Sequence, residues 1–91
     1  MWVRSEIERR LRAALAPQRL EVIDESARHT GHAGARPEGE THFRILVVSS
    51  AFAGLGRLER QRRVHALLAD LLRERVHALA IVARAPGEPL P

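Results

Sequence analysis

Apolar residues recur at helical spacing near the start of the chain. Three of them fall four residues apart and form one stripe: Ile7, Leu11 and Leu15. Ser5 precedes Glu8 by three residues, which is the spacing of a capping box and predicts a helix that begins at Ser5. Because Pro17 cannot continue a helix, this helix is expected to end near Ala16.

A longer amphipathic helix is predicted over residues 57–73. Its apolar stripe has five members: Val64, Leu67, Leu68, Leu71 and Leu72. Residues 50–56 lead into this helix, and their two closing glycines, Gly54 and Gly56, indicate a short helical turn or a tight loop.

Three other segments have the patterns of β-strands: residues 20–25, 41–49 and 76–83. The middle segment is the clearest, because three apolar residues alternate along it: Phe43, Ile45 and Val47. Its second half is apolar on both faces, which is expected of a central strand. A helix between the second and third strands lets these two run parallel, whereas the first two are expected to form an antiparallel pair.

The predicted fold class is α+β, with a three-stranded mixed sheet and helices packed on one face. The elements follow the order helix, strand, strand, short helix, helix, strand. Periodicity predicts a core of nine residues: Ile7, Leu11, Leu15, Ile45, Val47, Val64, Leu68, Leu71 and Ile81.

Length and composition are those of one small globular domain that spans residues 1–91. The chain is 45% hydrophobic and 29% charged, which excludes two full domains and the disordered class. It has no cysteine, so disulfides and thiolate ligands are excluded. No apolar run is long enough to cross a bilayer, and the first residues do not read as a secretory signal, so we expect a cytoplasmic protein without membrane contact.

Two segments are predicted to be irregular. Residues 26–40 have no apolar period and contain three Gly and one Pro, which indicates a long loop whose most mobile part is residues 28–38. Three prolines predict a frayed tail over residues 85–91: Pro86, Pro89 and Pro91.

Positive charge is concentrated on the two predicted helices. All fifteen basic residues are arginine, and residues 57–75 hold six of them against three acidic residues, a local charge of +3. Arg57, Arg60 and Arg63 follow at three-residue steps from the expected helix start, where a phosphate group could bind. The alternative is that these arginines form a solvated helix face.

Histidines are the main candidates for metal binding, since neutral imidazole is a good ligand for zinc, copper, iron and nickel. His29 and His32 lie three residues apart in the predicted loop, where the alternative is an exposed polar segment. His42 opens the second strand, and His65 lies beside the apolar stripe of the long helix. His77 opens the last strand, where it could be structural or could face the loop.

The chain contains none of the common catalytic motifs. It lacks the phosphate-binding G-x-x-x-x-G-K-[ST] and G-x-G-x-x-G patterns, the H-E-x-x-H zinc motif and the G-x-S-x-G nucleophile motif. Asp24 and Glu25 are adjacent on a strand and therefore point to opposite faces, so they cannot act as a carboxylate pair. We do not expect an enzyme.

Several ordered phrases together resemble the BolA-like proteins over nearly the whole chain. They are residues 20–26, His29, residues 39–43, residues 47–49, Phe52-x-Gly54, Arg60-x-Arg62 with Val64, and Val76-His77-Ala78-Leu79. The resemblance implies a class II KH-like fold of the order αββααβ. It also implies two roles, because members of this family share a glutathione-dependent [2Fe–2S] cluster with monothiol glutaredoxins, and many bacterial members are described as transcriptional regulators.

For the cluster, the resemblance implies ligands from two segments of this chain. The histidine of the Val-His-Ala-Leu phrase is His77, and the ligand from the loop between the first two strands is His29, with His32 as an alternative. The partner supplies its own cysteine and that of glutathione. The isolated protein, a monomer or weak homodimer, is then expected to hold no tightly bound cofactor.

For the second role, the resemblance leaves a DNA-binding regulator open, with Arg57, Arg60 and Arg63 as the candidate contacts. Two departures bear on these roles. The common Arg-His-Arg phrase has Gln61 in place of its histidine, and residues 54–56 are one residue short of the phosphate-clamping GXXG loop of KH modules.

Overall fold

The computed structural model describes residues 2–26 and 41–91. Its elements, in chain order, are α1 (Trp2–Leu15), β1 (Arg19–Asp24), β2 (His42–Val48), the short 3-10 helix η2 (Ser50–Phe52), α2 (Arg57–Leu67), α3 (Ala69–Glu74) and β3 (Ala78–Arg84). The segment that contains residues 28–38, predicted to be the most mobile, lies outside the described residues.

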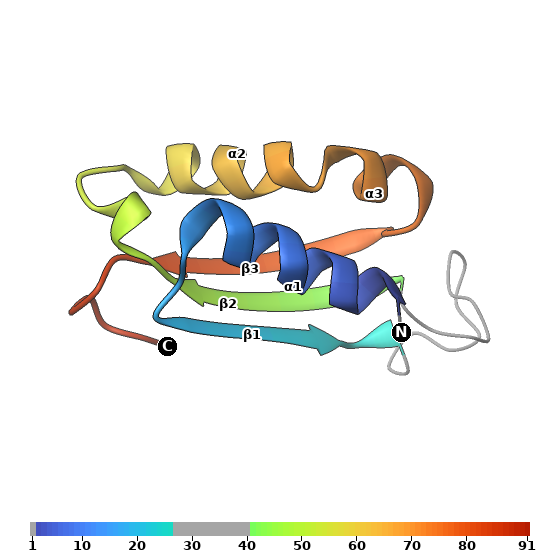
Figure 1. The fold of residues 1–91 in the computed structure, drawn as a ribbon, viewed down its shortest axis with the longest axis horizontal. Coiled ribbons are helices and arrows are strands. Elements are labelled where there is room, and N and C mark those ends of the chain that lie inside the picture. Colours follow the sequence, from blue (N-terminus) through green and yellow to red (C-terminus); the bar gives the residue numbers. More distant parts are fainter. Residues whose placement is uncertain (1, 27–40) are drawn as a thin grey trace.

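The strands form one mixed sheet with β2 in the centre. β1 pairs with β2 in the antiparallel sense, and β3 pairs with β2 in the parallel sense. The three helices lie on one face of this sheet (Figure 1). The predicted α+β class and the directions of both strand pairings are therefore confirmed. Among the described residues, no helix combines the length and apolar character that crossing a membrane requires.

The first helix begins at Trp2, three residues before the predicted start, so the capping box that Ser5 and Glu8 were expected to form is wrong. Glu8 instead accepts a hydrogen bond from Arg4 one turn earlier, at 3.1 Å. Burial of Val3 explains the longer helix, because Val3 extends the apolar stripe by one more turn. The helix ends at Leu15, next to the predicted residue.

The helix predicted over residues 57–73 is divided in two at Leu68, which has φ −113° and ψ 12°. Its N–H donates to the carbonyl of His65, three residues back, as in a 3-10 turn. Leu68 at the break and Leu71 in the helix after it are both buried in the core. A single uninterrupted helix was predicted because the apolar stripe continues through the break without a Gly or Pro to mark it.

Arg10 of α1 joins the first helix to this break. Its guanidinium donates to the carbonyl of Leu67 at 3.1 Å and to both carboxylate oxygens of Asp70, at 2.5 and 3.0 Å. The hydrogen bond from Arg10 lowers the pKa of Asp70 from 3.8 to about 2. Arg10 also binds Glu6 on its own helix at 2.7 Å, so one side chain links α1, α2 and α3.

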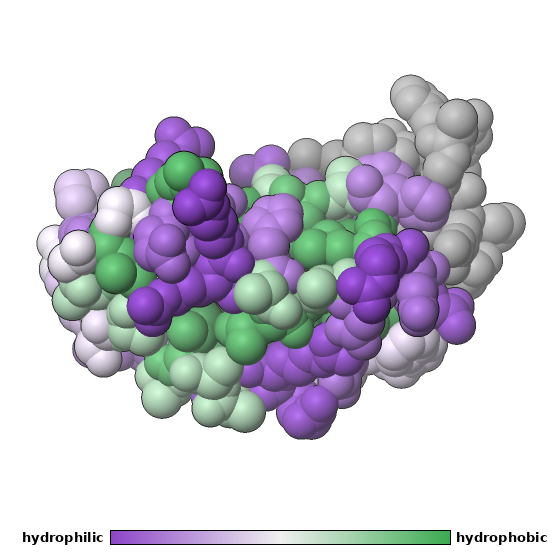
Figure 2. Space-filling view, turned by 90° about the horizontal axis from the view of Figure 1, so that it is seen from above, coloured by the Kyte–Doolittle hydropathy of each residue, from purple (hydrophilic) through white to green (hydrophobic). Residues whose placement is uncertain are grey.

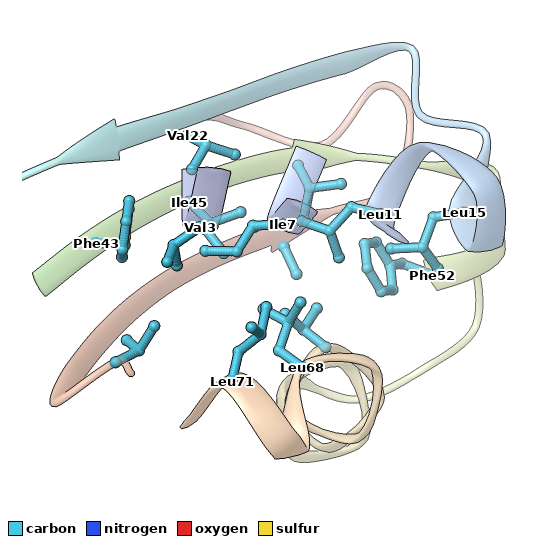
Figure 3. Packing of buried hydrophobic residues seen from close by; sticks show 14 of the residues in the cluster. Val3, Ile7, Leu11, Leu15, Val22, Phe43, Ile45, Phe52, Leu68 and Leu71 are labelled. Carbon is cyan, nitrogen blue, oxygen red and sulfur yellow. The ribbon is translucent and has the colours of Figure 1, made fainter. Parts of the chain in front are cut away.

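The core lies between the sheet and the helices (Figure 3). Eight of the nine predicted core residues are buried, and the exception, Ile81, is only partly buried because β3 is an edge strand with a neighbour on one side. The core also includes residues that the prediction did not name: Val3, Val22, Phe43, Phe52, Val76, Ala83 and Ala85. Phe52 reaches the core from η2 and is fully buried.

The tail predicted to fray from residue 85 instead folds back onto α2. The Glu88 carboxylate accepts two hydrogen bonds from Arg60, at 2.5 and 2.9 Å, and one from the N–H of Ala85 at 2.7 Å. The side chain of Arg84 donates to the carbonyl of Pro89 at 3.0 Å. The prolines indicated only that residues 85–91 form no helix or strand. They did not show that a buried arginine holds this segment.

Two neighbouring side chains of α2 also bind the outer edge of β3. Arg60 donates to the carbonyl of Ala83 at 3.2 Å, and Gln61 donates to the carbonyl of Ile81 at 3.1 Å. A third bond, from Arg60 to the carbonyl of Leu55 at 2.9 Å, connects the start of α2 to the same cluster.

Replacing Leu68 with Ala should lower the free energy of unfolding by about 2 to 5 kcal/mol, because the cavity left at a buried site cannot collapse fully. The control is Leu58→Ala on α2, where the side chain is 62% exposed and the expected change is within about 0.5 kcal/mol. Urea unfolding followed by circular dichroism measures both. Equal losses in the two variants would show that Leu68 does not pack as described.

Replacing Glu88 with Gln should lower the melting temperature at pH 7. Hydrogen bonds from Arg60, and then from the Ala85 N–H, lower the pKa of Glu88 from 4.5 to about 2 in the folded protein. Between these two pKa values, the unfolded chain therefore binds more protons than the folded protein does. The ionised Glu88 carboxylate thus stabilises the folded state fully above about pH 4.5, and this stabilisation is lost as the pH falls toward 2. The difference in melting temperature between wild type and Glu88→Gln should shrink over that pH range.

The control for this experiment is Glu59→Gln. Glu59 faces Arg63 at 3.7 Å, and both side chains are about half exposed, so its loss should have little effect at any pH. Thermal unfolding between pH 7 and pH 2.5 compares the three proteins. If the melting temperature of wild type stays above that of Glu88→Gln by a constant amount down to pH 2.5, the ionised form of Glu88 does not contribute as described.

Candidate functional site

Two histidine rings lie next to each other at one end of the sheet. His42 is the first residue of β2, and His77 directly precedes β3. Because these strands are parallel, with His42 in register with Ala78, their first residues lie side by side. The ring centroids of His42 and His77 are 6.3 Å apart, and the ring planes differ by 21°.

Thr41 fixes the backbone at this end of the sheet. Its carbonyl accepts hydrogen bonds from the N–H of His77 at 2.7 Å and from the N–H of Ala78 at 3.3 Å. The carbonyl of His42 accepts from the N–H of Glu25, also at 2.7 Å. Both histidines therefore extend from backbone that is hydrogen-bonded to a neighbouring segment.

The side chains at this end differ in exposure. Thr41 is fully buried, and its hydroxyl lies 2.8 Å from Nδ1 of His42, whose ring is partly buried. His77 is exposed. An approaching molecule would therefore reach the imidazole of His77, supported on one side by the ring of His42.

The predicted loop ligands, His29 and His32, lie outside the described residues. The structure does describe both ends of their segment, Ser26 and Thr41, and both are buried at the end of the sheet where His77 lies. Asp24 holds Ser26 by accepting hydrogen bonds from its N–H at 2.9 Å and from its hydroxyl. Within residues 2–26 and 41–91, no three His, Asp or Glu side chains are grouped so as to hold a metal ion.

Sequence reasoning considered His42 but gave it no role. The position of His42 beside His77 could have been predicted, because two parallel strands that start near residues 41 and 76 bring their first residues together. Thr41 was missed entirely, because nothing in the sequence distinguishes a threonine whose carbonyl joins two strands.

The three arginines singled out as DNA contacts have different surroundings. Arg57 is exposed at the start of α2, and Arg63 is half exposed and weakly paired with Glu59. Arg60 is only 9% exposed, and its guanidinium is taken up by Glu88 and by the carbonyls of Leu55 and Ala83. The expectation that Arg60 presents its charge to DNA conflicts with these contacts, because binding DNA would require breaking them.

Arg57, at the start of α2, and Arg84, at the end of β3, lie at the end of the molecule opposite the histidines. A cavity of about 510 Å³ lies between the start of α2 and the end of β3, and Arg57, Gln61 and Arg84 are among its lining residues. Seen from above α2, hydrophilic residues cover much of the surface and are interrupted by apolar ones (Figure 2). This cavity and the two histidines thus lie at opposite ends of the sheet.

The chain matches the BolA-like protein family over residues 11–88. BolA-like protein 1 of Homo sapiens is 51% identical over 86 residues, a match that covers 94% of this chain and 60% of the human protein. The DNA-binding transcriptional regulator BolA of Escherichia coli (strain K12) is 46% identical over 81 residues, covering 89% of this chain and 73% of the regulator.

Solved structures agree with these matches. The BolA domain of SufE1 from Arabidopsis thaliana is 42% identical to this chain and has a TM-score of 0.84. The match covers 94% of each of the two chains. The fold is therefore that of a small α+β domain with a mixed sheet and helices on one face, shared with BolA domains. The chain belongs to the BolA-like family, as the phrases of its sequence indicated.

Proposed function

We propose that this protein is an iron–sulfur adaptor that binds a monothiol glutaredoxin and shares a glutathione-dependent [2Fe–2S] cluster with it, in iron–sulfur trafficking or iron regulation. One observation carries the proposal. His77 has an exposed imidazole, and its backbone N–H is bound by the Thr41 carbonyl at the end of the sheet where β1 ends and β2 begins, the two strands that the segment containing His29 and His32 connects.

The residues at this end fit such a group. Imidazole replaces thiolate on one iron of Rieske-type [2Fe–2S] centres, and this chain, which has no cysteine, offers imidazole at His77. His29 is the proposed second ligand, and His32 is its alternative. When bound, a cluster with imidazole ligands supplies electron-transfer chemistry at a raised reduction potential.

In this proposal the described residues position His77. The hydrogen bond from its N–H to Thr41 fixes the backbone, and the ring of His42 lies against its own ring. Coordination of a metal by His77 needs the neutral form of its imidazole. Thiolate ligands come from the partner and from glutathione.

Replacing His77 with Ala should abolish the change in visible circular dichroism that occurs when cluster-loaded glutaredoxin meets this protein, because the cluster would lose its proposed ligand on the rigid backbone. His29→Ala should reduce the change, and only in part if His32 can substitute. The control is His65→Ala, which removes an exposed imidazole of α2. A spectrum that His77→Ala leaves unchanged would show that the ligand assignment is wrong, even if the two proteins still bind.

A second candidate function is DNA binding. The Escherichia coli relative is named as a DNA-binding transcriptional regulator, and α2 of this chain exposes Arg57, Arg62 and Arg63. Exposed arginines near a helix start can bind phosphate groups. Arg60 has no part in this proposal, because its charge is used inside the protein.

If this protein binds duplex DNA through α2, replacing Arg57 and Arg63 together with Ala should weaken binding. It should also reduce the slope of log K against log salt by roughly 2, since each lost phosphate contact contributes about 0.9. The control removes the same charge from α1, as Arg9→Ala with Arg12→Ala. Fluorescence anisotropy at several salt concentrations measures the slope, and an equal reduction in both variants would place no specific contact on α2.

A further inference from the structure

Trp2 and Arg75 form a cation–π pair at the end of the molecule where the candidate histidine site lies. Trp2 is the first residue of α1, and Arg75 lies between α3 and β3, two residues before His77. The guanidinium carbon of Arg75 is 5.2 Å from the centroid of the Trp2 ring. The start of α1 and the start of β3 lie at the same end of the molecule (Figure 1).

Arg75 differs from the ion-paired arginines in its partners. Within the part of the chain that the structure describes, seven arginines form ion pairs with carboxylates: Arg4, Arg9, Arg10, Arg19, Arg44, Arg60 and Arg63. Among the described residues, no carboxylate pairs with Arg75, and its side chain contacts the face of an aromatic ring instead. Its charge is exposed next to an exposed histidine.

A guanidinium that lies over an aromatic ring is suited to bind a carboxylate. The cation–π contact uses the face of the Trp2 ring and no carboxylate, so the guanidinium keeps N–H donors for two parallel hydrogen bonds to a ligand. The contact also restricts the long side chain before any ligand arrives, which lowers the entropy cost of binding. Trp2 is itself 54% exposed, so a ligand on Arg75 could also cover part of an apolar surface.

We propose that Trp2 and Arg75 form a carboxylate-binding site that takes a carboxylate of the glutathione brought by the glutaredoxin partner, an inference that rests on the proposed function. Glutathione is a tripeptide with a carboxylate at each end, and several bonds separate each carboxylate from the thiol. If the thiolate binds the metal next to His77, a carboxylate can therefore extend beyond His77 to a neighbouring cation. Arg75 is the cation nearest to His77 in the sequence and has no ion pair within the described residues.

The test uses the full chain and a cluster-loaded monothiol glutaredoxin, with the dissociation constant measured by titration calorimetry. Arg75→Gln should weaken binding by about tenfold, as expected for the loss of a charge-assisted hydrogen bond. Arg75→Lys, which keeps the charge but not the planar edge, should give an intermediate loss. Trp2→Ala should also weaken binding, because Arg75 is no longer held in place.

The matched control is Arg12→Gln, which removes an exposed arginine in the last turn of α1, at the opposite end of that helix from Trp2, and should leave the dissociation constant unchanged. Far-UV circular dichroism checks that each variant is folded. A second titration uses glutaredoxin without cluster or glutathione, and there Arg75→Gln should bind as wild type does. At saturating concentration, Arg75→Gln should keep the visible circular dichroism change that His77→Ala loses.

Wild-type affinity in Arg75→Gln would overturn the proposed site. So would an equal loss with and without glutathione, because the carboxylate would then belong to the glutaredoxin itself. If wild-type protein fails to bind cluster-loaded glutaredoxin at all, the proposed function fails and this inference fails with it. Binding that is intact but insensitive to Arg75 rejects this inference alone.

Discussion

The parallel pairing of β2 with β3 is the constraint on which the rest of the structure depends. Parallel neighbours cannot be joined by a tight turn, so the chain must cross back over the sheet, and η2, α2 and α3 form that crossover. The crossover covers the same face as α1, which gives the core its two sides (Figure 3). The pairing also brings His42 and His77 together, although they are far apart in the sequence.

Residue patterns were sufficient for the fold class because α1, α2 and β2 each have a clear period. The stripe of α1, the alternation along β2 and the glycines before α2 each determine local structure, and the crossover then determines strand direction. Element ends were less predictable, since they depend on tertiary contacts. Val3 extends α1 by packing into the core, and Arg10 binds a carbonyl and a carboxylate at the break between α2 and α3.

The candidate site was predictable only where a family phrase identified a residue, as with His77. The roles of Thr41 and Trp2 depend on which segments the fold brings together, and single-residue chemistry gives no sign of this. The arginines show the same limit. Arg57 and Arg60 look alike in the sequence, but one is exposed while the other is buried against Glu88. Regular spacing along a helix cannot distinguish a charge used inside the protein from one presented to a partner.

The bonds from Arg60 and Gln61 to the outer edge of β3 have a consequence for self-association. Strands of other molecules can add to the edges of a sheet, where backbone groups are unpaired, and proteins protect these edges in various ways. Here two carbonyls of β3 already accept hydrogen bonds from α2, so an incoming strand would have to displace both side chains before pairing there. Gln61, which stands where the family phrase has histidine, thus helps to protect this side of the sheet against domain swapping and fibrous aggregation.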